Sequence, residues 1–165
     1  MPRTLPILCA CLAAAAGYAA AQANVRIEPS HLEGPRVLQQ QTADAAIRDY
    51  LQSWQSMGAA LEQNRADLLN ADFAGAARSE VAGAIQQQAA LGIRTRYQDR
   101  SHDIQIVFYS PEGLSIELTD TVEYDVQILD HDKPLSTQQV RARYIAILTP
   151  SEVSWRVRVL QANPD

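Results

Sequence analysis

A carboxylate stands in an otherwise apolar run of alternating residues, and it is the clearest place in the sequence for chemistry. In the stretch Gly113–Asp130, the even-numbered positions from Leu114 to Ile128 are apolar or aromatic except for Asp120. Successive side chains of a strand point to opposite faces, so Asp120 would share a face with apolar neighbours. Either Asp120 marks a pocket, or a β-bulge at 118–121 swings it to solvent or a structural hydrogen bond satisfies it. We favour the bulge or the structural hydrogen bond.

Two histidines lie next to aspartates, but neither group matches a known motif. His131 lies between Asp130 and Asp132, which are metal-ligand types, yet the trio falls in a loop that ends at a proline, and this favours a polar turn. His102 precedes Asp103 at the start of the apolar part of a strand, where a satisfied histidine or a strand-end turn is a better interpretation than a catalytic dyad. We find no Ser-His-Asp spacing, glycine-rich phosphate loop or zinc signature, and we expect no cofactor and no metal.

The first 23 residues have the character of a secretory signal peptide. Arg3 is their only charge, an apolar, alanine-rich run follows, and Ala21-Gln22-Ala23 fits the small-x-small cleavage rule. A membrane span and a lipoprotein signal ending at Cys11 are the alternatives. The sequence therefore predicts a periplasmic or secreted protein that keeps no membrane span after cleavage.

Cleavage after Ala23 leaves 142 residues and removes both cysteines, Cys9 and Cys11. Without disulfides, an exported domain must rely on a hydrophobic core, and a chain of this length can form one as a single domain. The remaining 13 basic and 19 acidic residues give a negative net charge. This charge disfavours nucleic acid and anionic membranes as partners.

Helical periodicity follows a segment with none. Residues 24–41 contain Pro29, Gly34 and Pro35, and we expect a flexible N-terminal arm there. Thr42 is the expected N-cap of a first helix, and a second helix follows a break at Asn70–Asp72 and runs to Leu91. Apolar residues recur on the first helix at steps of three and four: Ile47, Tyr50, Leu51, Trp54, Met57 and Leu61.

After Gly92 the period changes to two. Four strands joined by short turns predict an antiparallel meander, and helices followed by strands indicate the α+β class. The expected strands are Ile93–Tyr109, Leu114–Leu129, Gln139–Thr149 and Val153–Gln161.

The alternation also predicts which side chains share a face of this sheet. Phe108 would lie with Ile104 on one face of the first strand, and Val159 with Trp155 in the last. If the loop at 130–134 is a simple hairpin, Glu123 comes near Arg141, as a cross-strand pair of opposite charge.

The order of elements resembles the nuclear-transport-factor-2-like superfamily, a cone-shaped α+β fold. Two helices precede a long meander that ends in Val-Ser-Trp-Arg-Val-Arg-Val-Leu, and the resemblance covers residues 42–162. The family usually inserts a short strand and a helix before the meander, and no clear third helix is visible here. A cystatin-like or other helix-on-sheet domain is the alternative. The family includes dehydratases, isomerases and cyclases as well as non-catalytic members of secretion and division assemblies, so the fold does not choose a function.

The resemblance implies a pocket between the concave face of the sheet and the helices. Asp120 and four other side chains would line it: Trp54, Met57, Tyr124 and Tyr144. No residue matches a catalytic motif of the family. We therefore expect an exported, non-enzymatic binding or assembly domain, whose partner is a small apolar ligand or an envelope protein and which could form a homodimer. The alternative is a small lyase or isomerase with Asp120 as base and Tyr124 or Tyr144 as hydrogen-bond donor.

Overall fold

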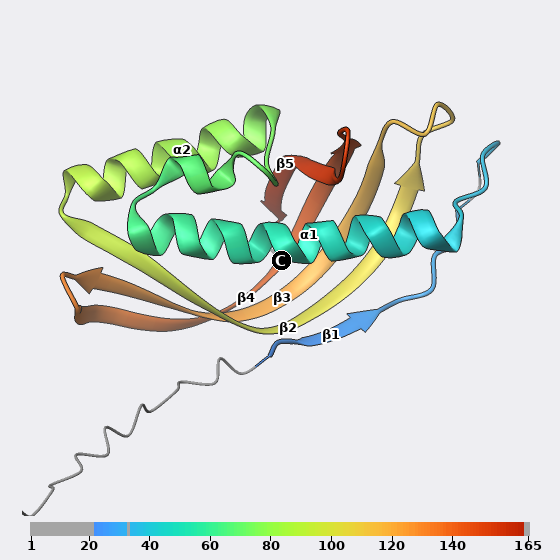
Figure 1. Cartoon of the computed structure of the whole chain (residues 1–165). Helices are drawn as coiled ribbons and strands as arrows, with labels where there is room; N and C mark the ends of the chain where they lie inside the picture. Colours follow the sequence, from blue (N-terminus) through green and yellow to red (C-terminus); the bar gives the residue numbers. More distant parts are fainter. Residues whose placement is uncertain (1–21, 33, 164–165) are drawn as a thin grey trace, which may run out of the picture.

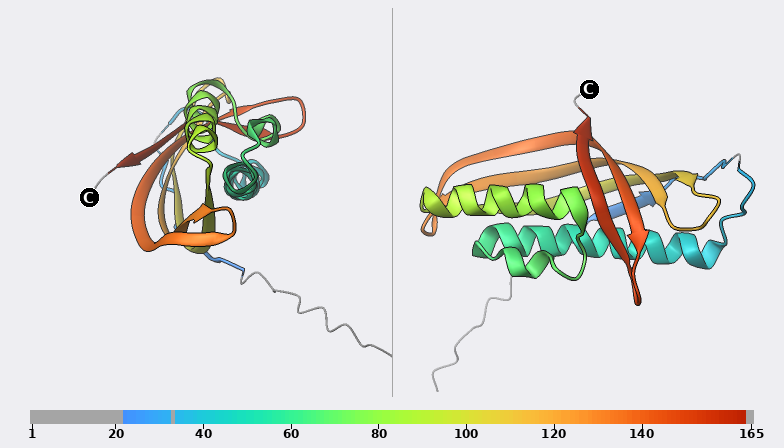
Figure 2. Two further views of the ribbon diagram at one scale, coloured as in Figure 1. Left: turned by 90° about the vertical axis from the view of Figure 1, so that its left-hand side faces the viewer. Right: turned by 90° about the horizontal axis from the view of Figure 1, so that it is seen from above.

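The computed structural model describes residues 22–32 and 34–163, which form a curved sheet with helices on its concave side (Figures 1 and 2). The predicted signal peptide falls almost wholly outside these residues. No helix within the described ranges is long and apolar enough to cross a membrane. In chain order the elements are β1 (Asn24–Ile27), α1 (Gln40–Gln63), the 3₁₀ helix η1 (Ala66–Leu69), α2 (Gly75–Ala90), β2 (Ile93–Tyr109), β3 (Ile116–Asp130), β4 (Lys133–Pro150) and β5 (Trp155–Asn163).

The sheet has five strands in the order β1-β2-β3-β4-β5, so the prediction of four antiparallel strands is wrong in detail. Strands β2 to β5 form the expected antiparallel meander. Strand β1 comes from the segment predicted as a flexible arm, and it pairs in parallel with Ser101–Ile104 of β2. All four of its residues are exposed, so no burial pattern in the sequence could reveal it.

The helices lie close to where periodicity places them. Helix α1 begins at Gln40, so Thr42 lies in its first turn and is not its N-cap. It ends where Asn64 adopts a left-handed conformation, with φ of 54°. Helix α2 ends just before Gly92, whose φ of 71° suits the glycine predicted to close it. The short η1 connects the two helices.

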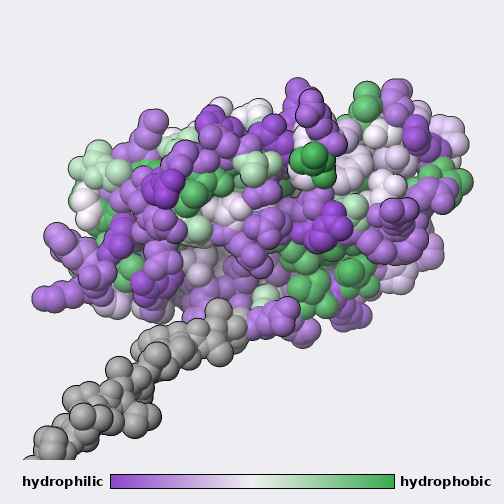
Figure 3. Space-filling model, in the orientation of Figure 1, coloured by the Kyte–Doolittle hydropathy of each residue, from purple (hydrophilic) through white to green (hydrophobic). Residues whose placement is uncertain are grey.

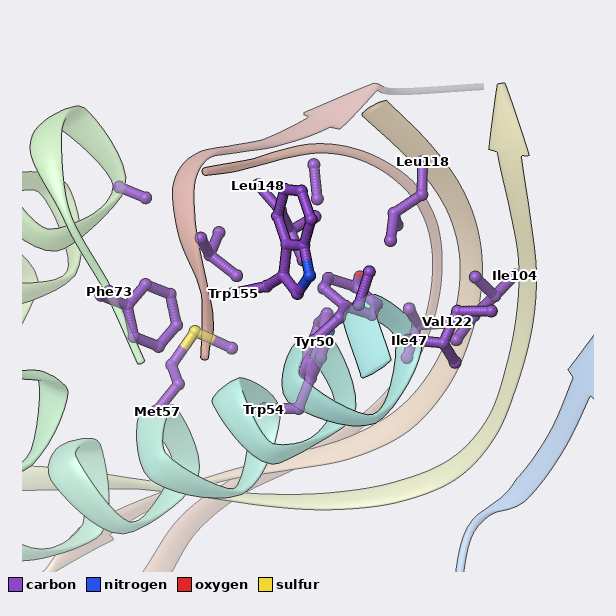
Figure 4. Close-up of a cluster of buried hydrophobic side chains, with 14 of the residues drawn as sticks. Ile47, Tyr50, Trp54, Met57, Phe73, Ile104, Leu118, Val122, Leu148 and Trp155 are labelled. Atoms are coloured by element: carbon purple, nitrogen blue, oxygen red, sulfur yellow. The ribbon is translucent and has the colours of Figure 1, made fainter. Parts of the chain in front are cut away.

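The core forms where the apolar face of α1 meets the concave face of the sheet. Figure 4 shows Tyr50, Trp54 and Met57 of α1 directed into this space, with Leu118 and Val122 among the strand residues drawn. Tyr50, Leu118 and Val122 are completely inaccessible to solvent. The apolar residues that recur along the predicted first helix therefore form the buried face of α1, although Leu51 is only half-buried.

Three bulges change the faces predicted from strict alternation. The β2–β3 register skips Arg100 and Val107, and the β4–β5 register skips Arg158. An extra residue reverses the direction of every later side chain. Phe108 is therefore 47% exposed, opposite Glu117 on the outer face, and not beside Ile104 as predicted. Val159 likewise lies on the face opposite to that of Trp155 and Val157, which is a second correction.

The hairpin between β3 and β4 has the predicted register. Glu123 lies opposite Arg141, and their side chains form an ion pair at 3.5 Å. The turn that joins the strands contains His131, with φ of 56°. The predicted pairing of Glu123 with Arg141 is confirmed, but β4 begins at Lys133 and not at Gln139, and its register with β3 skips Leu135 near the turn.

Candidate functional site

Asp120 is completely buried at the centre of β3. It lies opposite Ile104 of β2 and Tyr144 of β4, and the register of β3 is continuous on both sides of it. The bulge expected at 118–121 is therefore absent, which corrects the sequence interpretation. The two bulges in the β2–β3 pairing lie in β2, at Arg100 and Val107. They therefore do not change the face to which Asp120 of β3 points.

A structural hydrogen bond, the other half of the favoured interpretation, is present. The Tyr50 hydroxyl of α1 donates to Asp120 Oδ2 at 3.0 Å, and His102 Nδ1 lies 2.6 Å from the same oxygen. Both partners are buried. Asp120 therefore joins α1, β2 and β3 through one carboxylate oxygen.

His102 is held between two carboxylates. Its Nε2 lies 3.8 Å from Asp99 Oδ2, on the side opposite the 2.6 Å contact with Asp120. Burial alone would lower the pKa of His102, but its hydrogen bonds and charge interactions with Asp120 and Asp99 outweigh burial and raise the pKa to about 9. At neutral pH the ring is an imidazolium, and the cluster is an ion pair buried in the core.

Aromatic rings enclose this polar cluster. The Trp54 ring packs at 5.3 Å from the ring of His102, at 5.1 Å from Tyr144 and at 6.0 Å from Tyr124, measured between centroids. The hydroxyls of Tyr124 and Tyr144 bond to each other at 3.0 Å. Burial, reinforced by the charge of Asp120, raises the pKa of Tyr50 well above its usual value, and burial with the Tyr124 contact does the same for Tyr144. These phenols stay protonated at neutral pH.

Three buried polar atoms beside His102 have no hydrogen-bond partner in the protein. They are Trp54 Nε1, Asp120 Oδ1 and Asp99 Oδ1. A buried polar group without a partner costs free energy, and such atoms commonly bind an ordered water or a ligand. The cluster therefore has one donor and two acceptors available, although the Asp120 carboxylate has no direct access to solvent.

The predicted pocket residues are only partly brought together. Trp54, Tyr124 and Tyr144 contact one another, and Tyr144 lies opposite Asp120 in the β3–β4 register. Met57 lies one turn further along α1 and points toward Phe73 (Figure 4). From the sequence, Tyr50 was expected among the core residues of α1 and His102 as a satisfied histidine, and no local signal connected either residue to Asp120.

Two accessible concavities in the described part of the chain lie at another edge of the fold, near α1 and β1. A groove of about 390 Å³ runs between α1 and β1, and we call it the α1–β1 groove. It is lined by Ile27, Asp44, Ile47, Arg48, Leu51, Gln52 and Gln55. A second hollow of about 440 Å³ adjoins it, shares Ile27 and Ile47, and extends toward Leu38 and Ile106. Figure 3 shows apolar side chains gathered on this edge, between the positions of α1 and β1 in Figure 1.

The other histidine group is a turn, as predicted. His131 Nδ1 lies 2.7 Å from Asp130, while Arg94 binds Asp132 at 2.8 Å. Asp132 is therefore held by an arginine, which is the arrangement of a polar turn. Within residues 22–32 and 34–163, no three His, Cys, Asp or Glu side chains gather as metal ligands.

Comparisons with known proteins find likenesses in structure alone. No protein-family model matches the sequence, and no curated protein matches it. The intermembrane space region of the chloroplast protein ARC6 superposes with a TM-score of 0.65 at 14% identity, over 79% of this chain and 100% of that one. A candidate scytalone dehydratase from Novosphingobium aromaticivorans gives 0.52 at 13% identity, over 76% and 89%. A protein of Kribbella flavida gives 0.51 at 10% identity, over 73% and 91%.

These likenesses cover most of each chain at identities that carry information on the fold only. They agree with the α+β architecture described above, in which helices lie on the concave face of a curved, mostly antiparallel sheet. The chain therefore shares the α+β fold of these structures, as the resemblance seen in the sequence implied.

Proposed function

We propose that this protein is a non-enzymatic binding or assembly domain, and that the α1–β1 groove is its binding surface. The observation that supports this most strongly is the complete burial of Asp120. A catalytic base must come within hydrogen-bond distance of the proton it removes. Here one carboxylate oxygen is occupied by Tyr50 and His102, and the Trp54 ring packs against the ring of His102.

The α1–β1 groove has the chemistry of a recognition surface. Its apolar lining comes from Ile27, Ile47 and Leu51, and polar side chains such as Asp44 and Arg48 stand at its sides. Ligand sites are typically concave and largely apolar, with a few polar groups that fix orientation, and span roughly 300–1,000 Å³. The groove suits a small apolar ligand or the apolar side chains of a protein partner.

We also propose that the protein acts outside the cytoplasm, in the periplasm or as a secreted protein. The character of the first 23 residues supports this. The likeness to ARC6 is in keeping with it, because the similar part of that protein is its intermembrane space region.

Native mass spectrometry of the protein, purified gently from the envelope of its own host, tests the proposal. We expect a bound small molecule of defined mass or a co-purifying protein. Leu51→Lys places a charge in the α1–β1 groove and should abolish that association. Leu135→Lys, at an exposed position in β4, is the matched control and should retain it. An association that survives Leu51→Lys, in a variant that stays folded, contradicts the groove as the binding surface.

A small lyase or isomerase is the second candidate, and the unpartnered Asp120 Oδ1 and Trp54 Nε1 favour it. Asp120 Oδ1 would act as the base, and Tyr144, only half-buried, as a hydrogen-bond donor. The likeness to a candidate scytalone dehydratase supports this reading at the level of fold. Incubation of the wild type and Asp120→Asn with host metabolite extracts tests it. Consumption of a compound by the wild type alone, with the variant folded, would replace the binding proposal.

A further inference from the structure

Strand β1 leaves one edge of the sheet open within the described residues. Glu28 N–H donates to Ile104 C=O at 2.8 Å, so the backbone groups of Glu28 point toward β2. Successive residues of a strand direct these groups to opposite edges. The N–H and C=O groups of Val25 and Ile27 therefore point away from β2, where no described strand pairs with them. Figure 1 shows β1 as the outermost strand on this side.

The side chains of this edge strand are also unusually apolar for an exposed position. Val25 and Ile27 lie opposite His102 and Ile104, so they point to the same face as the core. They nevertheless remain 40% and 56% exposed. An open edge with exposed apolar residues is a template for pairing with another strand, and proteins usually protect such edges with bulges, prolines or inward charges.

The sequence of β1 is complementary to itself in one antiparallel register. When Ile27 lies on a two-fold axis, Arg26 of each copy comes opposite Glu28 of the other, and Ile27 packs against Ile27. The outward backbone groups of Ile27 then form the hydrogen-bonded pair that such a register requires. A register centred on Arg26 would instead place two arginines opposite each other, which is destabilising.

We propose that two copies of this chain pair through their β1 edges, antiparallel and centred on Ile27, to form one sheet that continues across the dimer. Arg26 and Glu28 already form an ion pair within one copy, at 2.8 Å, and both side chains reach solvent. In the dimer they form a group of four alternating charges on the outer face. An isologous interface of this kind closes on itself, so it gives a dimer and no filament.

The dimer goes beyond the proposed function, because it forms through the backbone edge of β1, although the Ile27 side chain also lines the α1–β1 groove. Leu51→Lys changes the groove and leaves the β1 edge intact, so the failure of either proposal can be recognised separately.

Analytical ultracentrifugation of the full chain, over a wide concentration range, tests the dimer. We expect a monomer–dimer equilibrium in the wild type. Arg26→Glu places glutamates opposite each other and should weaken association about tenfold or more. The double variant Arg26→Glu/Glu28→Arg restores opposite charges in the same register and should recover dimerisation. Val153→Lys, at a 93% exposed site in a distant turn, is the control.

A cysteine pair fixes the register. Paired residues in a hydrogen-bonded antiparallel position lie about 5.5 Å apart at Cα, within the range of a disulfide. In a background that carries Cys9→Ser and Cys11→Ser, Ile27→Cys should oxidise to a covalent dimer, whereas Val153→Cys should not. A wild type that stays monomeric at all concentrations overturns the proposal, and so does a dimer that Arg26→Glu leaves unchanged.

Discussion

His102 and Asp120 form a buried ion pair that joins two neighbouring strands, with 2.6 Å between Nδ1 and Oδ2. The pair is diagonal in the β2–β3 register, since Asp120 lies opposite Ile104 and His102 lies opposite Val122. Diagonal neighbours remain within reach of long side chains. The same contact that satisfies the histidine also places a charged group at the centre of the core, where removing either partner leaves the other charge buried.

The pH dependence of stability should report this pair. His102 has a pKa of about 9 in the folded protein, against 6.5 for an unperturbed histidine. The folded state therefore holds this proton over a range in which the unfolded chain releases it. The resulting stabilisation is fully present below about pH 6.5 and is lost as the pH rises to about 9. We expect the free energy of unfolding, measured by urea denaturation, to fall by up to about 3 kcal/mol across this window.

Two histidine variants provide the controls for this experiment. His102→Gln should flatten the pH dependence between 6.5 and 9, because it removes the titrating group. His131→Gln, in an exposed turn, should preserve the wild-type slope. If His102→Gln and the wild type show the same slope, the assignment of the proton to His102 is wrong.

Neutralising Asp120 should destabilise the protein strongly. Asp120→Asn leaves the His102 charge buried without its main partner, and breaking such a pair typically costs about 3–5 kcal/mol. Glu123→Gln, three residues further along β3, breaks the surface pair with Arg141 and should cost no more than about 1 kcal/mol. Denaturant unfolding of the two variants gives the comparison, and equal losses would show that the buried cluster contributes little.

Asp49 should be the most important carboxylate on α1. Its Oδ2 accepts the backbone N–H of Trp155 at 2.8 Å, which ties the helix to the start of β5. Asp49→Ala leaves that buried N–H unpaired, and we expect a loss of about 1–3 kcal/mol in the free energy of unfolding. Asp44→Ala is a matched control on the same helix, because Asp44 is exposed and accepts only from Gln40. The gain in helix propensity is common to both variants, so the difference between them measures the tie to β5.

Substitutions of two adjacent glutamines of α2 should also change the free energy of unfolding by different amounts, because one side chain is buried and the other is exposed. Gln88 is buried, donates to Leu61 C=O and Asn64 Oδ1, and accepts from the Thr95 hydroxyl at 2.7 Å. Gln87 is exposed. Gln88→Ala leaves several buried groups unsatisfied and should cost about 1–3 kcal/mol, whereas Gln87→Ala should change stability by less than about 0.5 kcal/mol. Thermal or urea unfolding separates the two, and similar losses would contradict the role of Gln88 in holding α2 to β2.

Much of the architecture follows from local patterns. The change of period at Gly92 marks the boundary between helices and strands, and the first long strand begins and ends where the alternation predicts. The Glu123–Arg141 pair could be predicted because a short hairpin fixes the register of the strands it joins. The resemblance to a cone-shaped fold rests on this order of elements, and the structural likenesses confirm it.

Only part of the candidate site could be predicted from the sequence. Asp120 is conspicuous because it interrupts an apolar face, and Tyr50 and His102 each have a visible place in their own element. Their meeting depends on the β2–β3 register, which two bulges in β2 shift by one residue each. A bulge leaves no reliable mark in composition, so the faces of Phe108 and Asp99 could not be assigned from alternation alone.

The sequence by itself determined the α+β class, the order of the helices and long strands, and the buried stripe of α1, because hydrophobic period and turn residues act over a few neighbouring positions. Only the tertiary structure decided that Asp120 is sealed in the core with His102, and that residues 24–27 add a parallel edge strand. Both outcomes depend on contacts between segments far apart in the chain. Such contacts are selected by the packing of the whole fold, and no local pattern specifies them.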